Sequence, residues 1–265
     1  AAWVFLAGQL FKITDYKNCY RIMSVLVLVL GLFAVFFLIK TPEDLGQKPL
    51  GWATDAGSAG NTADVPGVSY KDALKSSTFK FLVLGLLFTS FGGTVFLSYA
   101  SWWQMNGMSA TGAANWNAIY LLLAGGLLLV AGTISEKLGT KGFVFYVCVA
   151  YVLTFICMVV WSATGGAVYM MVLTVIFGAA AYPVNASIPS FVGTAAFGPR
   201  EFGQISATLM IAVYIGQATA SPIMAAILQT AGGMGLGWKI CAIAVAVGMA
   251  FLLAALKVSP MKDKK

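Results

Sequence analysis

Histidine is absent from this sequence of 265 residues, and Lys, Arg, Asp and Glu together make up only 9% of it. An ordinary soluble domain has about 25% charged residues, so the deficit excludes a soluble globular protein. Cysteines are few, and none has the CxxC spacing of a metal site (Cys19, Cys148, Cys157 and Cys241). Without histidine to complete a ligand set or a catalytic pair, we expect neither a metal site nor a cofactor and interpret the cysteines as free thiols.

Charge is sparse and spread out. The 16 Lys and Arg residues stand against 9 Asp and Glu, which gives a net charge of +7. The basic residues are scattered between apolar runs and form no contiguous patch, so nucleic acid is not an expected partner. All the acidic residues lie outside the apolar runs. The sequence therefore offers no carboxylate within a membrane span and no base beside a nucleophile, and it does not predict an enzyme.

Hydrophobic residues form 60% of the chain, and the mean hydropathy is +0.87. About 20 apolar helical residues cross a bilayer core. Apolar runs of that order, free of charge except for Arg21 at the start of the first, predict transmembrane helices at residues 20–39, 81–103, 115–134, 143–161, 167–192, 203–230 and 240–256. Residues 1–11 would reach only about halfway across. We expect an all-α polytopic membrane protein in the lipid bilayer, with seven complete transmembrane helices plus a partial one, taken from a longer chain.

The stretch at residues 40–80 differs from the rest, with Pro42, Pro49, Pro66 and five lysines. It is interpreted as a solvent-exposed linker. Its last part, residues 69–80, alternates apolar and cationic side chains and predicts a short amphipathic helix on the membrane surface.

Lys and Arg are distributed unequally between the two sides of this topology. One side carries twelve of them, including those of the linker and of the C-terminal tail, and the other side carries four (Lys12, Lys17, Arg21 and Lys239). Cytoplasmic loops carry the excess of positive charge. We therefore expect a multi-pass protein of the cell's inner membrane with the linker and the C-terminus in the cytoplasm.

Two similar segments precede predicted helices that lie far apart in the chain. Residues 15–22 and residues 236–241 each contain an aromatic residue, a cation and Ile. In both segments these residues lie where a predicted helix begins on the non-cytoplasmic side of the membrane. Six helices separate the two segments. Two six-helix halves joined by a long linker would produce this spacing.

Three loops resemble those of the major facilitator superfamily. Residues 132–141 resemble its Gly-x-x-x-Asp-Arg-x-Gly-Arg-Arg loop, with Glu136 in place of Asp and Thr140 in place of a cation. Residues 41–49 resemble the start of the central linker in its monocarboxylate and oxalate/formate branches. Residues 197–203 resemble the cytoplasmic loop that enters the eleventh helix of those branches.

The resemblance implies a major-facilitator-like C-terminal half bundle that runs from the end of helix 5 through helix 12. Residues 1–39 would end the N-terminal bundle, residues 40–80 would join the halves, residues 81–257 would form a six-helix bundle and residues 258–265 the cytoplasmic tail. It further implies a secondary transporter, antiporter or symporter, that carries a small organic solute by alternating access, with the missing N-terminal bundle as its partner. The implied solute is a monocarboxylate-like anion, and the implied cytoplasmic gating loop contains Gly132, Glu136, Lys137, Gly139 and Lys141.

Neutral polar residues fall on defined faces of the predicted helices. At about 100° per residue, the helix at 203–230 carries a polar stripe (Ser206, Met210, Tyr214, Gln217 and Ser221) and a face of small residues (Thr208, Ala212, Gly216 and Ala220). The small face suits close helix packing. The polar stripe suits a water-filled cavity, because transporter sites lie near the bilayer midplane.

Other predicted helices repeat this pattern. One stripe of the helix at 167–192 contains Gly178, Tyr182, Asn185 and Pro189, and one face of the helix at 81–103 contains Ser90, Thr94, Ser98 and Ser101. Asn117 and Tyr120 form an i, i+3 pair near the outer end of the next span. The candidate substrate-binding residues are Tyr182, Asn185, Tyr214, Gln217, Ser90, Thr94, Asn117 and Tyr120.

Simpler interpretations of these residues remain open. Ser and Thr in membrane helices commonly bond their own backbone or a neighbouring helix, and we favour that reading for the stripe from Ser90 to Ser101. Pro183, Pro189 and Pro222 are either plain kinks or parts of a gate. The alternative function is a non-transporting membrane scaffold or assembly subunit with the same fold, whose inward helix faces would be apolar.

Overall fold

The structure is a computed structural model that describes residues 10, 14–37, 67–96, 98–230 and 233–261. Every regular element within these ranges is a helix, and they contain no strand. The chain divides into two compact units, Ala1–Asp64 and Val65–Lys265. The all-α fold expected from the sequence is therefore confirmed.

The first unit contains helix α2 (Tyr16–Phe37). The side chain of Asp15 accepts a hydrogen bond from the backbone N–H of Asn18 at 3.1 Å, which satisfies one of the free donors at the start of the helix. Within its own unit α2 leaves large apolar side chains such as Leu28 and Phe36 exposed. Its segment Lys17–Ala34 is long and apolar enough to cross a membrane, as predicted for residues 20–39.

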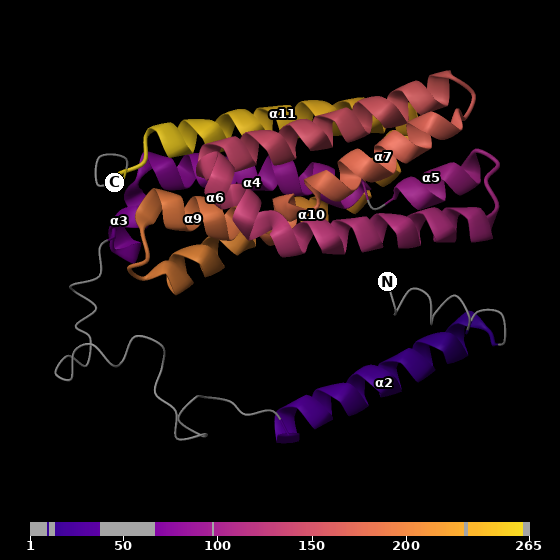
Figure 1. Cartoon of the computed structure of the whole chain (residues 1–265), viewed down its shortest axis with the longest axis horizontal. Coiled ribbons are helices and arrows are strands. Elements are labelled where there is room, and N and C mark those ends of the chain that lie inside the picture. Colours follow the sequence, from indigo (N-terminus) through magenta and orange to yellow (C-terminus); the bar gives the residue numbers. More distant parts are fainter. Residues whose placement is uncertain (1–9, 11–13, 38–66, 97, 231–232, 262–265) are drawn as a thin grey trace. The chain divides into compact units, whose positions relative to one another are not determined.

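The second unit is a helical bundle (Figure 1). Its elements are α3 (Tyr70–Lys75), α4 (Ser77–Phe96), α5 (Tyr99–Met105), α6 (Ala110–Ala163), α7 (Val168–Ala181), α8 (Pro183–Ala186), α9 (Ile188–Phe197), α10 (Phe202–Leu228) and α11 (Gly233–Lys257). Across the described parts of both units, five helical segments are long and apolar enough to cross a membrane. The protein is thus a multi-pass membrane protein.

Two predicted spans form the single bent element α6. Its two arms contain the predicted spans at 115–134 and 143–161, and the backbone departs from helical geometry at Gly139, where φ is 68° and ψ is 161°. A positive φ of this kind suits glycine, which has no Cβ to clash with the backbone. The two arms of α6 are therefore two helices that meet directly at a kink at Gly139, rather than helices joined by the ten-residue loop that the sequence suggested.

The predicted helix at 167–192 is broken into three pieces, α7, α8 and α9. Pro183 is the first residue of α8, and Pro189 is the second residue of α9. Proline fits the first turn of a helix because the N–H that it lacks has no partner there. The two prolines therefore mark helix starts within one predicted span.

The predicted amphipathic helix at residues 69–80 is shorter than expected. Helix α3 has only 6 residues and ends at Ser76, whose φ of −71° and ψ of 147° are extended. Residues 77–80 belong to α4 instead. The Ser76 hydroxyl accepts from the N–H of Phe79 at 3.1 Å and so favours a new helix start at this point.

Segments from distant parts of the sequence meet at one end of the second unit. The N–H of Val68 donates to the carbonyl of Phe197 at 2.8 Å, and the Ser259 hydroxyl donates to the carbonyl of Ala196 at 2.9 Å. The Thr78 hydroxyl donates to the carbonyl of Val258 at 3.1 Å. In Figure 1 the loops after α5 and before α7 lie at the opposite end. The described end of the linker and the start of the tail thus share one end of the bundle, as the predicted topology requires.

Small residues bring α4 close to α10 and α11. A Cβ on Gly216 would lie 2.4 Å from the carbonyl oxygen of Leu87, and a Cβ on Gly248 would lie 2.9 Å from that of Gly85. Ala212 and Ala220 are buried beside Gly216. Close backbone approach through small residues is a common way to pack membrane helices. The packing role predicted for the small face of α10 is confirmed at these three positions.

Candidate functional site

Aromatic side chains fill the bundle where α4, α5 and α6 meet. The ring of Phe96 lies at the centre, with centroid distances of 4.8 Å to Tyr99, 5.4 Å to Tyr120 and 5.9 Å to Tyr151. Space for the Phe96 ring comes from Gly178, because a Cβ there would lie 2.5 Å from the ring. Edge-to-face pairs add roughly 0.5–1.5 kcal/mol each beyond area burial. This aromatic cluster gives the neighbouring polar groups a rigid support.

Asn117 and Tyr120 are held by this cluster. The Tyr99 hydroxyl donates to the Oδ1 atom of Asn117 at 2.7 Å, which fixes the orientation of the half-buried amide. Tyr120 is only 2% exposed and packs edge-to-face on Tyr99 at 5.5 Å. The i, i+3 pair predicted from the sequence is therefore a preorganised part of the bundle.

Tyr182 joins the same cluster from the break between α7 and α8. Its ring meets that of Tyr120 edge-to-face at 6.3 Å, and 36% of the residue stays exposed. Its backbone N–H donates to the carbonyl of Ala179 at 3.3 Å. Pro183 has no N–H to bond this carbonyl, so the bond from Tyr182 satisfies it. The backbone of Asn185 lies in α8, and its side chain is outside the described part of the structure.

The polar stripe of α10 borders the buried small face. Tyr214 is 59% exposed and Gln217 is half-buried. Among the described residues, none forms a hydrogen bond with the Gln217 amide. Ile211 and Ile215 are also exposed and lie on a third, apolar arc of the helix. Helix α10 thus has three distinct faces: one packed on α4, one polar and one apolar.

Ser90 and Thr94 are part of the helix packing. Ser90 is completely buried, and its hydroxyl has no partner in the described structure. The Thr94 hydroxyl donates to the carbonyl of Ser90 at 3.1 Å, a local bond common in membrane helices. In this conformation the Ser90 hydroxyl reaches no surface, so contact with a solute would require α4 to separate from its neighbours.

The predicted gating loop lies around the bend of α6. Gly132, Glu136, Lys137, Gly139 and Lys141 are all exposed. In the described ranges, neither Glu136 nor Lys137 takes part in an ion pair. These two charged side chains are therefore not held to the bundle by an ion pair in the part of the chain that the structure describes.

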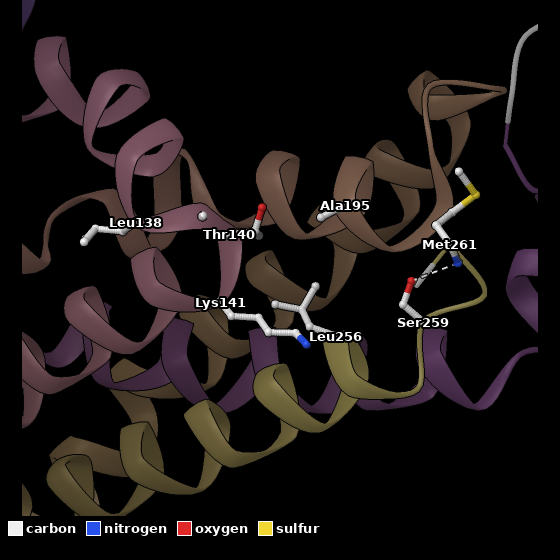
Figure 2. Close-up of a pocket in the computed structure, with 8 residues that line it drawn as sticks. Leu138, Thr140, Lys141, Ala195, Leu256, Ser259 and Met261 are labelled. Atoms are coloured by element: carbon white, nitrogen blue, oxygen red, sulfur yellow. Dashed lines mark hydrogen bonds between the residues drawn. The ribbon is translucent and has the colours of Figure 1, made fainter. Parts of the chain in front are cut away.

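A cavity of about 330 Å³ opens beside this bend (Figure 2). It lies between the bend of α6, helix α9 and the end of α11, and residues lining it include Thr140, Lys141, Leu256 and Ser259. Figure 2 also shows the hydrogen bond from the N–H of Met261 to the Ser259 hydroxyl, which is 3.1 Å long. The cavity belongs to the end of the bundle where the linker and the tail meet.

The structure thus brings some candidate residues together and leaves others apart. Asn117, Tyr120 and Tyr182 belong to one aromatic cluster, whereas Tyr214 and Gln217 lie on the polar stripe of α10. Sequence reasoning missed Tyr99, which orients Asn117. The helical spacing of Phe96, Tyr99 and Trp103, at i, i+3 and i+7, was the signal that could have revealed it.

Comparison with known proteins gives one family. The family model of the Major Facilitator Superfamily matches residues 2–218, which is more than half of the chain. No curated protein matches the sequence. The match includes the bend at Gly139 and most of the polar stripe of α10. The chain therefore belongs to the Major Facilitator Superfamily, a family of membrane transporters.

Proposed function

We propose that this chain is the C-terminal part of a secondary active transporter that moves a small organic solute by alternating access. The observation that carries the proposal is the division of α10 into faces. Its small face is packed against α4, while Tyr214 and Gln217 point out of the unit beside it. An amide facing lipid is costly unless it has a partner. A water-filled cavity shared with a second helix bundle would solvate this stripe.

The scaffold alternative is less well supported. A scaffold needs no wet cavity, so apolar residues would serve at the positions of Tyr182, Tyr214 and Gln217. The family match also favours a transporter.

A monocarboxylate-like anion is the proposed solute. The exposed hydroxyl groups of Tyr182 and Tyr214 and the amide of Gln217 can donate hydrogen bonds to a carboxylate. The basic side chains of the described spans lie near the ends of the apolar runs or, as with Lys137 and Lys141, beside the bend of α6, so the polar stripe of α10 offers no pair of cations for a dianion. The resemblance to the monocarboxylate branch supports the same choice.

The proposed partner is an N-terminal helix bundle that supplies the other wall of the cavity. In this proposal residues 1–39 end that bundle, residues 40–80 link the halves, and residues 81–257 form the second bundle. Membranes containing this chain alone should show no uptake of a labelled monocarboxylate such as lactate, because half of the cavity wall is absent. Co-expression with the upstream half should restore part of the uptake. Uptake by this chain alone would refute the need for a second bundle.

We also propose that the linker and the C-terminus lie in the cytoplasm of a cell whose inner membrane holds the protein. The exposed residues Lys137, in the bend of α6, and Met105, at the end of α5, provide a matched pair of test positions. With an impermeant thiol reagent on intact cells, Met105→Cys should be labelled and Lys137→Cys should not. Labelling of Lys137→Cys and not of Met105→Cys would show that the protein has the opposite orientation in the membrane.

A further inference from the structure

A short strap, residues 67–70, lies on the turn that joins α9 to α10. The N–H of Val68 donates to the carbonyl of Phe197 at 2.8 Å, and the N–H of Tyr70 donates to the Oε2 atom of Glu201 at 2.8 Å. The hydroxyls of Tyr70 and Thr208 are 3.0 Å apart and share a further hydrogen bond. The strap thus contacts the end of α9, the turn and the second turn of α10.

The strap and the turn fit closely. A Cβ on Gly67 would lie 2.6 Å from the Cβ of Arg200 and 2.9 Å from the carbonyl oxygen of Phe197. A larger residue at position 67 would therefore push the strap away from the turn. This contact requires glycine.

Glu201 is held in an unfavourable backbone conformation. Its φ of 49° and ψ of 24° are left-handed, and it is the one residue other than glycine with a positive φ in the described ranges. It occupies the N-cap position of α10, yet its side chain forms no cap bond to that helix. The Oε2 atom of its carboxylate instead accepts the hydrogen bond from the N–H of Tyr70, and its Oε1 atom lies 3.9 Å from the Nε atom of Arg200. Strain of this kind persists only where surrounding contacts compensate for it.

We propose that the contact between the strap and the turn can form and break, and we call this contact the catch. Its hydrogen bond to Glu201 would hold the start of α10 in place, and loss of that bond would allow the start of α10 to move. With the strap bound, the charge-assisted bond to Tyr70 compensates for the strained backbone of Glu201. With the strap released, the bond is lost and the backbone of Glu201 can relax. Release would therefore exchange one charge-assisted hydrogen bond for relief of the backbone strain at Glu201. This inference goes beyond the proposed function, because it concerns control of one end of α10 and not the solute site.

The position of the strap in the chain indicates what the catch could control. The strap directly follows the segment that connects it to the Ala1–Asp64 unit, and α10 carries the polar stripe with Tyr214 and Gln217. Alternating access requires helix ends to part on one side of the membrane. Release of the strap would allow the end of α10 near Glu201 to part from its neighbours.

Thiol labelling can test the catch in the full chain in isolated membranes. Ile205 is completely buried, and its N–H bonds the carbonyl of Glu201 at 3.2 Å, so Ile205→Cys reports opening of this end of α10. Adding Glu201→Ala should raise the labelling rate of Ile205→Cys by a maleimide at least several-fold. Glu201→Gln keeps an oxygen acceptor and should have a smaller effect. Tyr70→Phe, which loses only the bond to Thr208, should also have a smaller effect.

Two controls separate opening from other effects. Lys71→Ala changes an exposed residue of α3 and should leave the rate at Ile205→Cys unchanged. The protein without Ile205→Cys reports unfolding, because its native thiols at Cys148 and Cys241 are buried. If Glu201→Ala exposes these thiols, Glu201→Gly replaces it, since glycine accepts the left-handed conformation. Equal labelling of Ile205→Cys with and without the Glu201 substitution would overturn the proposal, and so would exposure of the native thiols by Glu201→Gly as well.

Discussion

Replacing Gly216 by Val should strongly destabilise the protein. The new Cβ would lie 2.4 Å from the carbonyl oxygen of Leu87 and 3.2 Å from the N atom of Phe91. These are backbone atoms of α4, so α10 and α4 must separate to make room. Overpacking of a core typically costs about 1–3 kcal/mol and occasionally more. We expect the thermal midpoint of the detergent-solubilised protein to fall by many degrees. We also expect the monodisperse fraction to be lost.

Gly125 is the matched control for this change. It also lies within a long helix, but apart from its chain neighbours and the backbone of its own helix, no atom lies within 4 Å of the position where its Cβ would be built. Gly125→Val should therefore leave the thermal midpoint nearly unchanged. Similar decreases in the thermal midpoint of both variants would mean that the effect comes from helix propensity and not from the contact between α10 and α4.

Replacing Gln217 by Ala should weaken transport with little effect on folding. The residue is half-buried on the polar stripe of α10, and no described residue bonds its amide. If the amide donates to the solute, its loss leaves a solute oxygen without a partner, at a cost on the order of 1 to 3 kcal/mol. The expected result is a higher apparent substrate constant with a near-normal maximal rate, measured as uptake by the complete carrier.

Ile211→Ala provides the comparison on the same helix. Ile211 is 56% exposed and lies on the apolar arc, which we assign to lipid. This variant should transport with an unchanged substrate constant. Normal transport by Gln217→Ala together with a raised constant in Ile211→Ala would reverse the assignment of the two faces, and the polar stripe would then be a packing surface.

The features that follow from composition and periodicity were predictable. Runs of about 20 apolar residues located the helices, because a bilayer fixes the length of a crossing helix. The small face of α10 was predictable for a related reason, since i, i+4 spacing places Ala212, Gly216 and Ala220 on one side. Ala212 is 4% exposed in the structure and Ala220 is completely buried.

Features that depend on tertiary contacts were not predictable. The bend at Gly139 replaces a loop because a single glycine with positive φ can reverse the chain, and sequence alone does not reveal which glycine will do so. The strain at Glu201 has no sequence signal, because it is stabilised by Tyr70, which is 131 residues away. The spacing of Phe96, Tyr99 and Trp103 places Tyr99 on a shared aromatic face, but it does not show that the Tyr99 hydroxyl will meet Asn117.

The end of α9 has a practical consequence for fusion proteins. Its carbonyls at Ala196 and Phe197 accept hydrogen bonds from Ser259 and Val68, so the residues just after α11 are part of the folded bundle. Ser259 is only 8% exposed, and its hydroxyl also accepts from the N–H of Met261. A fluorescent protein or an affinity tag joined before Ser259 would remove its hydroxyl and leave the carbonyl of Ala196, near the end of α9, without this partner. The junction that preserves the bundle lies beyond Met261.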